Sequence, residues 1–224
     1  MRDRRFGILE AMKTTSILHS FIAVSALAFL SFAFFGCATT DGGSSGSAAG
    51  KSRGSNEDAP KVVISTSMGD ITVELDVEKA PLTVTNFLRY VDSNFYDRTL
   101  VHRVERSVLI EAGGYDVLYN RKQTKPSIPN EADNGLRNRR GTISMARGKA
   151  ASSATSRFFI NLDDNEGFDY DPEDPKQHGY AVFGRVTKGL SVADRISKVE
   201  VKAAHGLRDT PAEVVAIKTI RRVK

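Results

Sequence analysis

From Lys61 onwards, hydrophobic and polar positions alternate along much of the chain, a pattern typical of strands that face a core on one side. Two such runs around Met68-Gly69-Asp70 predict a β-hairpin over residues 61–76, with the glycine in its turn. The stretch Val101–Tyr115 begins with a strand, continues into an apolar run and ends in a glycine pair. Further strands are predicted at residues 141–146, 156–162, 180–186 and 213–221.

Two segments have helical spacing instead. Ala80-Pro81 opens the first helix, because proline is favoured in the first turn. Its apolar face comprises Val84, Phe87, Leu88 and Val91. A shorter helix is predicted at residues 191–198. About eight strands, two helices and frequent turns predict a mainly β fold, a closed antiparallel barrel with the helices covering its ends.

The N-terminus has the organisation of an export signal. Basic residues precede an apolar stretch, Ile17–Phe35, and small residues then surround the single cysteine, Cys37. We therefore expect residues 1–36 to be a signal peptide, whose start is either Met1 or Met12. Its end resembles the lipobox of bacterial lipoproteins, in which the cysteine is lipidated. The alternative is an uncleaved transmembrane anchor, because the apolar stretch is nearly long enough to span a bilayer.

Both alternatives place a tethered domain outside the cytoplasm. Ala38, rather than aspartate, follows the cysteine, and in Gram-negative lipoproteins this resembles an outer-membrane address. We therefore expect a membrane-anchored lipoprotein of the cell envelope that faces the periplasm, with the outer membrane favoured over the inner. Residues 37–60 are rich in glycine and serine and predict a flexible linker, and residues 61–224 form the folded domain.

Composition and spacing exclude several classes of site. The net charge of +5 falls to +3 from Cys37 onwards, so nucleic acid is not an expected partner. One cysteine excludes an intramolecular disulfide, and the four histidines lack metal-ligand spacing. The acidic run Asp163–Asp174 lacks the glycine and glutamate of a calcium loop and is interpreted as a solvated loop. The basic cluster Arg137, Arg139 and Arg140 is likewise interpreted as solvated surface.

Arg103 is the first candidate for chemistry. It lies in the hydrophobic stretch Val101–Tyr115, where a guanidinium is costly to bury unless its five donors find partners. The rest of the domain is therefore interpreted as the scaffold that holds this arginine against a pocket.

The motifs of the domain, taken together, resemble a known family. From Val62 to about Val223 they occur in this order: Gly69-Asp70-Ile71, Ala80-Pro81 with Asn86-Phe87, Phe95-Tyr96, His102-Arg103-Val104, Gly113-Gly114, Asn130-Glu131, Gly141–Ala146, Ser156–Ile160 and Val182–Val186. In order and spacing the chain resembles the cyclophilins, which are peptidyl-prolyl cis-trans isomerases, and most closely the bacterial members. The family fold is an eight-stranded antiparallel barrel capped by two helices.

The resemblance implies catalysis of rotation about the X-Pro amide, whose barrier is about 18–20 kcal/mol. The twisted state has a pyramidal proline nitrogen, and a guanidinium that donates to this nitrogen stabilises it. By resemblance, Arg103 is the catalytic arginine and Phe159 the aromatic floor of the proline pocket. Ala146 and Arg147 match the strand end whose main chain pairs with the bound peptide. The implied partners are proline-containing polypeptides, with no cofactor or metal, and we expect a monomer.

Several positions that should grip the proline ring depart from the family pattern. Val108 and Leu109 stand where phenylalanine and methionine are usual. Gly167 falls where tryptophan or phenylalanine is usual, and Phe168 beside it is a candidate to supply the ring. Tyr180 stands where bacterial members carry tyrosine. The smaller Val108 predicts a weaker hold on the proline ring, by up to a few kcal/mol if the space does not refill.

Two further departures concern the arginine itself. Glu111 and Arg157 replace two usual glutamines, one of which orients the catalytic arginine. A carboxylate at 111 either fixes Arg103 through strong bidentate bonds or occupies donors that the proline nitrogen needs. Arg157 is expected to compete for Glu111 and to form an Arg-Glu-Arg cluster.

Two functional hypotheses follow. The first is a peptidyl-prolyl isomerase that assists the folding of envelope proteins through a divergent, weakened proline pocket. The second is a catalytically impaired module that binds proline-containing or extended segments as a chaperone or assembly factor, in which Arg103 serves only as an ion-pair partner of Glu111. A purely structural lipoprotein would leave the retained Arg103 and Phe159 unexplained.

Overall fold

The computed structural model describes residues 59–174 and 176–223. Cys37, the predicted signal peptide and nearly all of the predicted linker lie outside these residues. Within the described ranges, no helix combines the length and the apolar character that crossing a bilayer requires.

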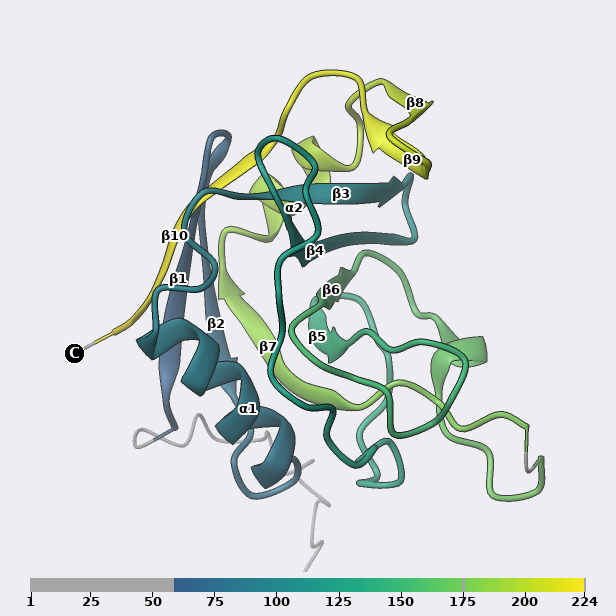
Figure 1. Ribbon diagram of the computed structural model, residues 1–224. Helices are drawn as coiled ribbons and strands as arrows, with labels where there is room; N and C mark the ends of the chain where they lie inside the picture. The colour runs from purple at the N-terminus through teal and green to yellow at the C-terminus, as the bar shows by residue number, and fades with distance from the viewer. Residues whose placement is uncertain (1–58, 175, 224) are drawn as a thin grey trace, which may run out of the picture. The chain divides into compact units, whose positions relative to one another are not determined.

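Eight strands close into an antiparallel barrel, which confirms the fold class predicted from the alternating pattern (Figure 1). Around the barrel the order is β1-β10-β3-β4-β6-β5-β7-β2. The strands are β1 (Lys61–Thr66), β2 (Gly69–Leu75), β3 (Thr99–Glu105), β4 (Leu109–Asp116), β5 (Thr142–Met145), β6 (Phe158–Asn161), β7 (Val182–Lys188) and β10 (Ala216–Arg222). Closure leaves no unpaired sheet edge in the barrel.

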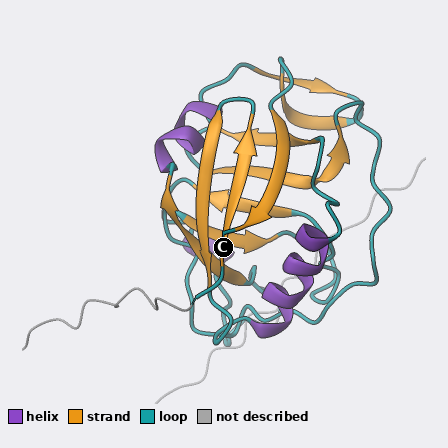
Figure 2. Ribbon diagram, turned by 90° about the vertical axis from the view of Figure 1, so that its left-hand side faces the viewer, coloured by secondary structure: helices purple, strands orange, loops and turns teal. Residues whose placement is uncertain are grey.

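Two helices, α1 (Pro81–Asp92) and α2 (Leu190–Ile196), lie on opposite sides of the barrel in Figure 2. The N-terminus of α1 has no side-chain cap from its own segment. Instead the carboxylate of Glu131 accepts hydrogen bonds from the backbone amides of Leu82 and Thr83, at 3.0 and 2.7 Å. A negative group at this end satisfies amides that have no partner within the helix and also complements the helix dipole.

Aromatic rings fill the barrel interior beneath α1. The ring centroid of Phe87 lies 5.3 Å from that of Tyr96, 5.5 Å from that of Phe158 and 5.2 Å from that of Phe183. Phe158 belongs to this core, whereas its neighbour Phe159 belongs to a separate cluster. Adjacent side chains of a strand point to opposite faces, and these two rings accordingly lie on opposite sides of β6.

Some boundaries differ from the predicted ones. A two-stranded sheet of β8 (Val201–Ala204) and β9 (Leu207–Pro211), which lies beside β3, was not predicted. Its residues are mostly exposed, so they lack the alternation that marks a strand with one buried face. Val108 lies in the turn between β3 and β4 rather than in a strand, and Tyr180 precedes β7.

Candidate functional site

An apolar cluster on the outside of the barrel is separate from the core, and we call it the outer cluster. Its buried members are Leu109, Ala146 and Phe159, and Val108, Phe168 and Tyr180 pack against them. The rings of Phe159, Phe168 and Tyr180 meet edge to face, with centroids 5.4 to 5.8 Å apart. The structure thus brings together the six apolar residues that the sequence proposes for a proline pocket, Phe168 among them.

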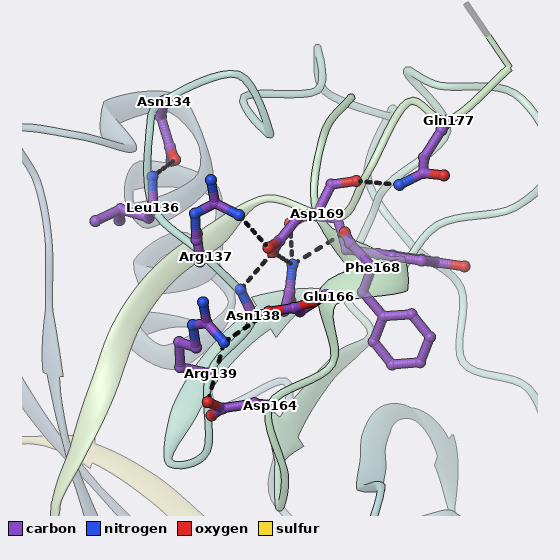
Figure 3. A network of polar contacts seen from close by, with 11 residues as sticks. Asn134, Leu136, Arg137, Asn138, Arg139, Asp164, Glu166, Phe168, Asp169 and Gln177 are labelled. Carbon is purple, nitrogen blue, oxygen red and sulfur yellow. Dashed lines mark hydrogen bonds and ion pairs between the residues drawn. The ribbon is translucent and has the colours of Figure 1, made fainter. Parts of the chain in front are cut away.

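Asn138 hydrogen-bonds to the backbone of both segments that carry Phe168 and Tyr180, and Figure 3 shows its bond to Phe168. The Nδ2 group of Asn138 donates to the carbonyls of Phe168, at 3.0 Å, and Tyr180, at 3.3 Å. Its Oδ1 accepts a hydrogen bond from the buried hydroxyl of Ser144 at 2.7 Å. Because the carbonyl of Phe168 is fixed inward, its ring projects away from this network, as Figure 3 shows. One buried amide therefore positions two rings of the outer cluster.

The charged segments interpreted as solvated surface are mostly exposed, and they also pair with each other beside this network. Arg139 pairs with Asp164 at 3.0 Å and with Glu166 at 3.2 Å, and Arg137 pairs with Asp169 at 3.5 Å. Asp169 is buried and also accepts the backbone N–H of Asn138 at 2.6 Å. The basic cluster and the acidic run are each other's partners, because each neutralises the other beside the 3-10 turn Glu166–Phe168.

A β-bulge aims two adjacent residues of β3 at one carboxylate. The register shifts between Val101, which faces Ala112, and Arg103, which faces Glu111. In a regular strand neighbouring side chains point to opposite faces, but a bulge re-aims one of them. Both His102 and Arg103 consequently approach Glu111, and the backbone carbonyl of His102 accepts a hydrogen bond from the hydroxyl of Thr210 on β9.

Glu111 is the buried centre of this charged group, with 8% of its side chain exposed. Its carboxylate accepts a 2.7 Å hydrogen bond from Nη1 of Arg157 and lies 3.4 Å from Nε2 of His102. Burial raises the pKa of Glu111, but the hydrogen bond and charge of His102 and the charges of Arg157 and Arg103 outweigh it, so the pKa falls below its ordinary value. Glu111 is therefore held ionised by cations from β3 and from the residue just before β6.

Gly114 makes room for the Arg157 side chain. A Cβ atom at position 114 would lie 2.8 Å from both Cγ and Cδ of Arg157, closer than side-chain carbons approach. The absence of a side chain at position 114 thus lets the aliphatic part of Arg157 pack over β4 and its guanidinium reach Glu111. This packing explains why a glycine suits the second position of the Gly113-Gly114 pair.

Arg103 makes its shortest contact with Glu105 on its own strand. Nη2 of Arg103 donates to Oε2 of Glu105 at 2.6 Å, whereas Nη1 lies 3.8 Å from Oε2 of Glu111. The predicted Arg-Glu-Arg cluster is present, and of the two alternatives for Glu111 the structure lacks the bidentate bond with Arg103. Arg157 approaches Glu111 more closely and donates the hydrogen bond, so Arg103 keeps only the longer ion pair.

At the other end of the outer cluster, the chain leaves β5 through Ala146 and Arg147. The Ala146 amide donates to the carbonyl of Arg157 at 3.0 Å. The Arg147 guanidinium lies over the ring of Tyr180, 4.7 Å from its centroid, and Nε donates to the carbonyl of Gly179 at 2.9 Å. The Arg147 side chain thus packs along the rim of the cluster.

These features can be compared with known proteins. The protein family described as "Cyclophilin type peptidyl-prolyl cis-trans isomerase/CLD" matches residues 61–222. The chain belongs to the cyclophilin family. The match spans every strand of the barrel and both helices, so family membership applies to the whole described domain.

Bacterial relatives of this cyclophilin are similar over the same region. Peptidyl-prolyl cis-trans isomerase A of Dickeya dadantii is 45% identical over 163 residues, which are 73% of this chain and 84% of the relative. Peptidyl-prolyl cis-trans isomerase B of Escherichia coli is 42% identical over 159 residues, which are 71% and 97% of the two chains. A solved cyclophilin-type isomerase from Cryptosporidium parvum has the same fold, with a TM-score of 0.60 and 22% identity over 74% of this chain and 98% of its own.

Sequence reasoning missed the residues that support the site. Asn138 stands between arginines and looked like part of a solvated loop, and Asp169 sits in an acidic run. The strand pattern contains a signal for Glu105, because residues two apart on a strand share one face and Glu105 is two residues from Arg103. Within the described ranges, no three His, Cys, Asp or Glu side chains are placed to hold a metal ion.

The depressed pKa of Glu111 predicts a pH-dependent contribution to stability. Ionised Glu111 stabilises the fold above its unfolded pKa of about 4.3, and this contribution is lost as the pH falls through the lower folded value. At pH 7, Glu111→Gln is expected to lower the free energy of unfolding by about 1–3 kcal/mol. Urea denaturation should show this difference shrinking below pH 4, whereas the exposed-site control Asp163→Asn should stay near wild type. A difference that is constant with pH would contradict the assignment.

Proposed function

We propose that this cyclophilin is an active peptidyl-prolyl cis-trans isomerase with Arg103 as its catalytic residue. The observation that carries the proposal is the alignment of three residues on neighbouring strands, on the outer face of the barrel. Arg103 pairs in register with Glu111, and Glu111 pairs with Phe159. Since neighbouring strands lie about 4.8 Å apart, the Cα atoms of Arg103 and Phe159 are roughly 10 Å apart. That spacing suits an apolar floor for the proline ring and a guanidinium that reaches its nitrogen.

The chemistry follows from this arrangement. A client proline packs against the outer cluster, and the main chain at Ala146 and Arg147 aligns the peptide that precedes or follows it. As the amide twists, its nitrogen regains a lone pair, and an N–H of Arg103 donates to it. The hydrogen bond is stronger in the twisted state than in either planar state, so it lowers the barrier without a covalent intermediate.

We also propose that this activity is weaker than in cyclophilins with the usual pocket residues. Val108 is half-buried in the turn, where a phenylalanine would present a larger wall. The guanidinium of Arg103 faces two carboxylates, Glu105 and Glu111, which reduce the positive field at the proline nitrogen. The second observation favours the alternative function, a module that binds proline-containing segments as a chaperone or assembly factor.

The clients that we propose are proline-containing polypeptides of the cell envelope. The proposal rests on the export signal, on the single cysteine at its end and on the glycine- and serine-rich residues up to 60. Lipidated Cys37 would hold the domain at a membrane, with the outer membrane favoured, while the linker lets it sample clients in the periplasm.

Arg103→Ala is expected to lower kcat/KM for a proline peptide by about 100-fold or more, because it removes the only donor proposed for the proline nitrogen. Exchange NMR on the peptide measures the rate. Arg106→Ala is the matched control, since this exposed arginine of the same hairpin donates to the carbonyl of Lys198 and should leave the rate within about twofold. Wild-type exchange no faster than in buffer, at concentrations where the peptide binds, would leave only the binding module.

Val108→Phe is expected to raise kcat/KM by two- to tenfold. A ring at this position would add an aromatic contact with the proline ring and the outer cluster, and such contacts contribute about 0.5–1.5 kcal/mol. The gain should appear as a lower KM or peptide Kd, measured on the purified domain. An unchanged Kd would show that residue 108 is not a wall of the proline site.

Cys37→Ser tests the anchor. In a Gram-negative host, the full-length chain should fractionate with the outer membrane and carry a lipid, shown by mass spectrometry of the mature N-terminus. The serine variant cannot be lipidated and should lose the lipid mass and the normal processing. A wild-type chain that keeps residues 1–36 and stays in the membrane would establish the uncleaved anchor instead.

A further inference from the structure

Arg103 makes its shortest contact with Glu105. Glu105 lies two residues beyond Arg103 on β3, and its Oε2 accepts the 2.6 Å hydrogen bond from Nη2. In the β3–β4 pairing Glu105 faces Leu109, a buried member of the outer cluster. Residues two apart on a strand share one face, so Arg103 and Glu105 stand together beside the proposed proline site.

The two carboxylates around Arg103 differ in how readily they can release it. Glu111 is buried and already bonded to Arg157, so a client side chain has no access to it. Glu105 and Arg103 are 42% and 40% exposed, and an ion pair of that exposure is weak and open to exchange. Among the described residues, the only ion pair recorded for Glu105 is the one with Arg103.

Neighbouring charges do not replace this partner. Arg106 is turned towards the backbone carbonyl of Lys198, after α2, at 3.3 Å. Arg157, just before β6, donates to Glu111 and to the carbonyl of Arg147. His102 faces Glu111 from the bulge. If Arg103 turns towards a proline nitrogen, Glu105 therefore loses its ion-pair partner unless the client brings a cation.

We propose that Glu105 holds Arg103 in a resting orientation and selects clients that carry lysine or arginine next to the proline. A basic client side chain takes the place of Arg103 on Glu105, and the freed Nη2 group then donates to the proline nitrogen. Glu105 keeps a cationic partner throughout the exchange, so release of the arginine costs little. This inference rests on the catalytic role proposed for Arg103, and Glu105 acts through that residue as a positioning residue.

The first test measures the restraint. With an uncharged proline peptide, Glu105→Gln should raise kcat/KM two- to fivefold, and Glu105→Asp should restore part of the restraint. Salt screens exposed ion pairs, so wild-type activity should rise from 0.05 to about 1 M NaCl, while Glu105→Gln should show no rise. Asp92→Asn is the matched control, because it breaks an exposed 2.6 Å arginine pair with Arg222 away from the site. A Glu105→Gln rate equal to or below wild type would overturn the restraint.

The second test measures selection and does not depend on turnover. Peptides with lysine or glutamate at each position flanking the proline are titrated by calorimetry. Wild type should bind the best lysine peptide at least threefold more tightly than its glutamate counterpart, and Glu105→Gln should lose that preference. Equal affinities in wild type would overturn the inference even in an active enzyme. Lysine selection without catalysis in wild type would instead retain the role of Glu105 in selection and reject the proposed isomerase.

Discussion

The buried carboxylate of Glu111 is the constraint on which the site depends. An ionised group with so little exposure must be surrounded by donors, since an unpaired buried charge would destabilise the fold by several kcal/mol. The barrel meets this demand from both sides, with His102 and Arg103 on β3 and Arg157 just before β6. Arg157, and not Arg103, makes the close bond, which leaves Arg103 the most adaptable member of the group.

The apolar half of the site is organised by the barrel in a different way. Strands β4 and β6 send alternate side chains inward to the core and outward to the site, so Phe158 and Phe159 belong to two separate clusters from adjacent positions. The rings contributed by loops need additional support, because no ladder fixes them. Asn138 and the paired charged segments provide it, so that the largely exposed loop around Phe168 still holds a ring of the outer cluster in place.

The barrel and both helices could be predicted from the sequence, because alternation and helical spacing are local properties. The apolar residues of the outer cluster were identified through the family resemblance. The pairing within the charged group could not be predicted in the same way. Whether Glu111 bonds to Arg103 or to Arg157 depends on two features. Gly114 leaves room for the aliphatic part of the Arg157 side chain, and the bulge in β3 sets the direction of Arg103. Similarly, the link between Asn138 and Asp169 joins residues 31 apart, which carry no shared pattern.

The bulge at His102 has a consequence for how this barrel can change. A deletion of one residue there would remove one of the two register shifts between β3 and β4 and make their pairing more regular. It would also turn either the histidine or the arginine into the interior and leave Glu111 short of a partner. The bulge depends on the number of residues in β3 and not on which residues they are. Insertions or deletions in this hairpin are therefore expected to damage the site more than most substitutions. A barrel redesigned without the bulge would keep the fold but lose the arrangement of His102 and Arg103 around Glu111.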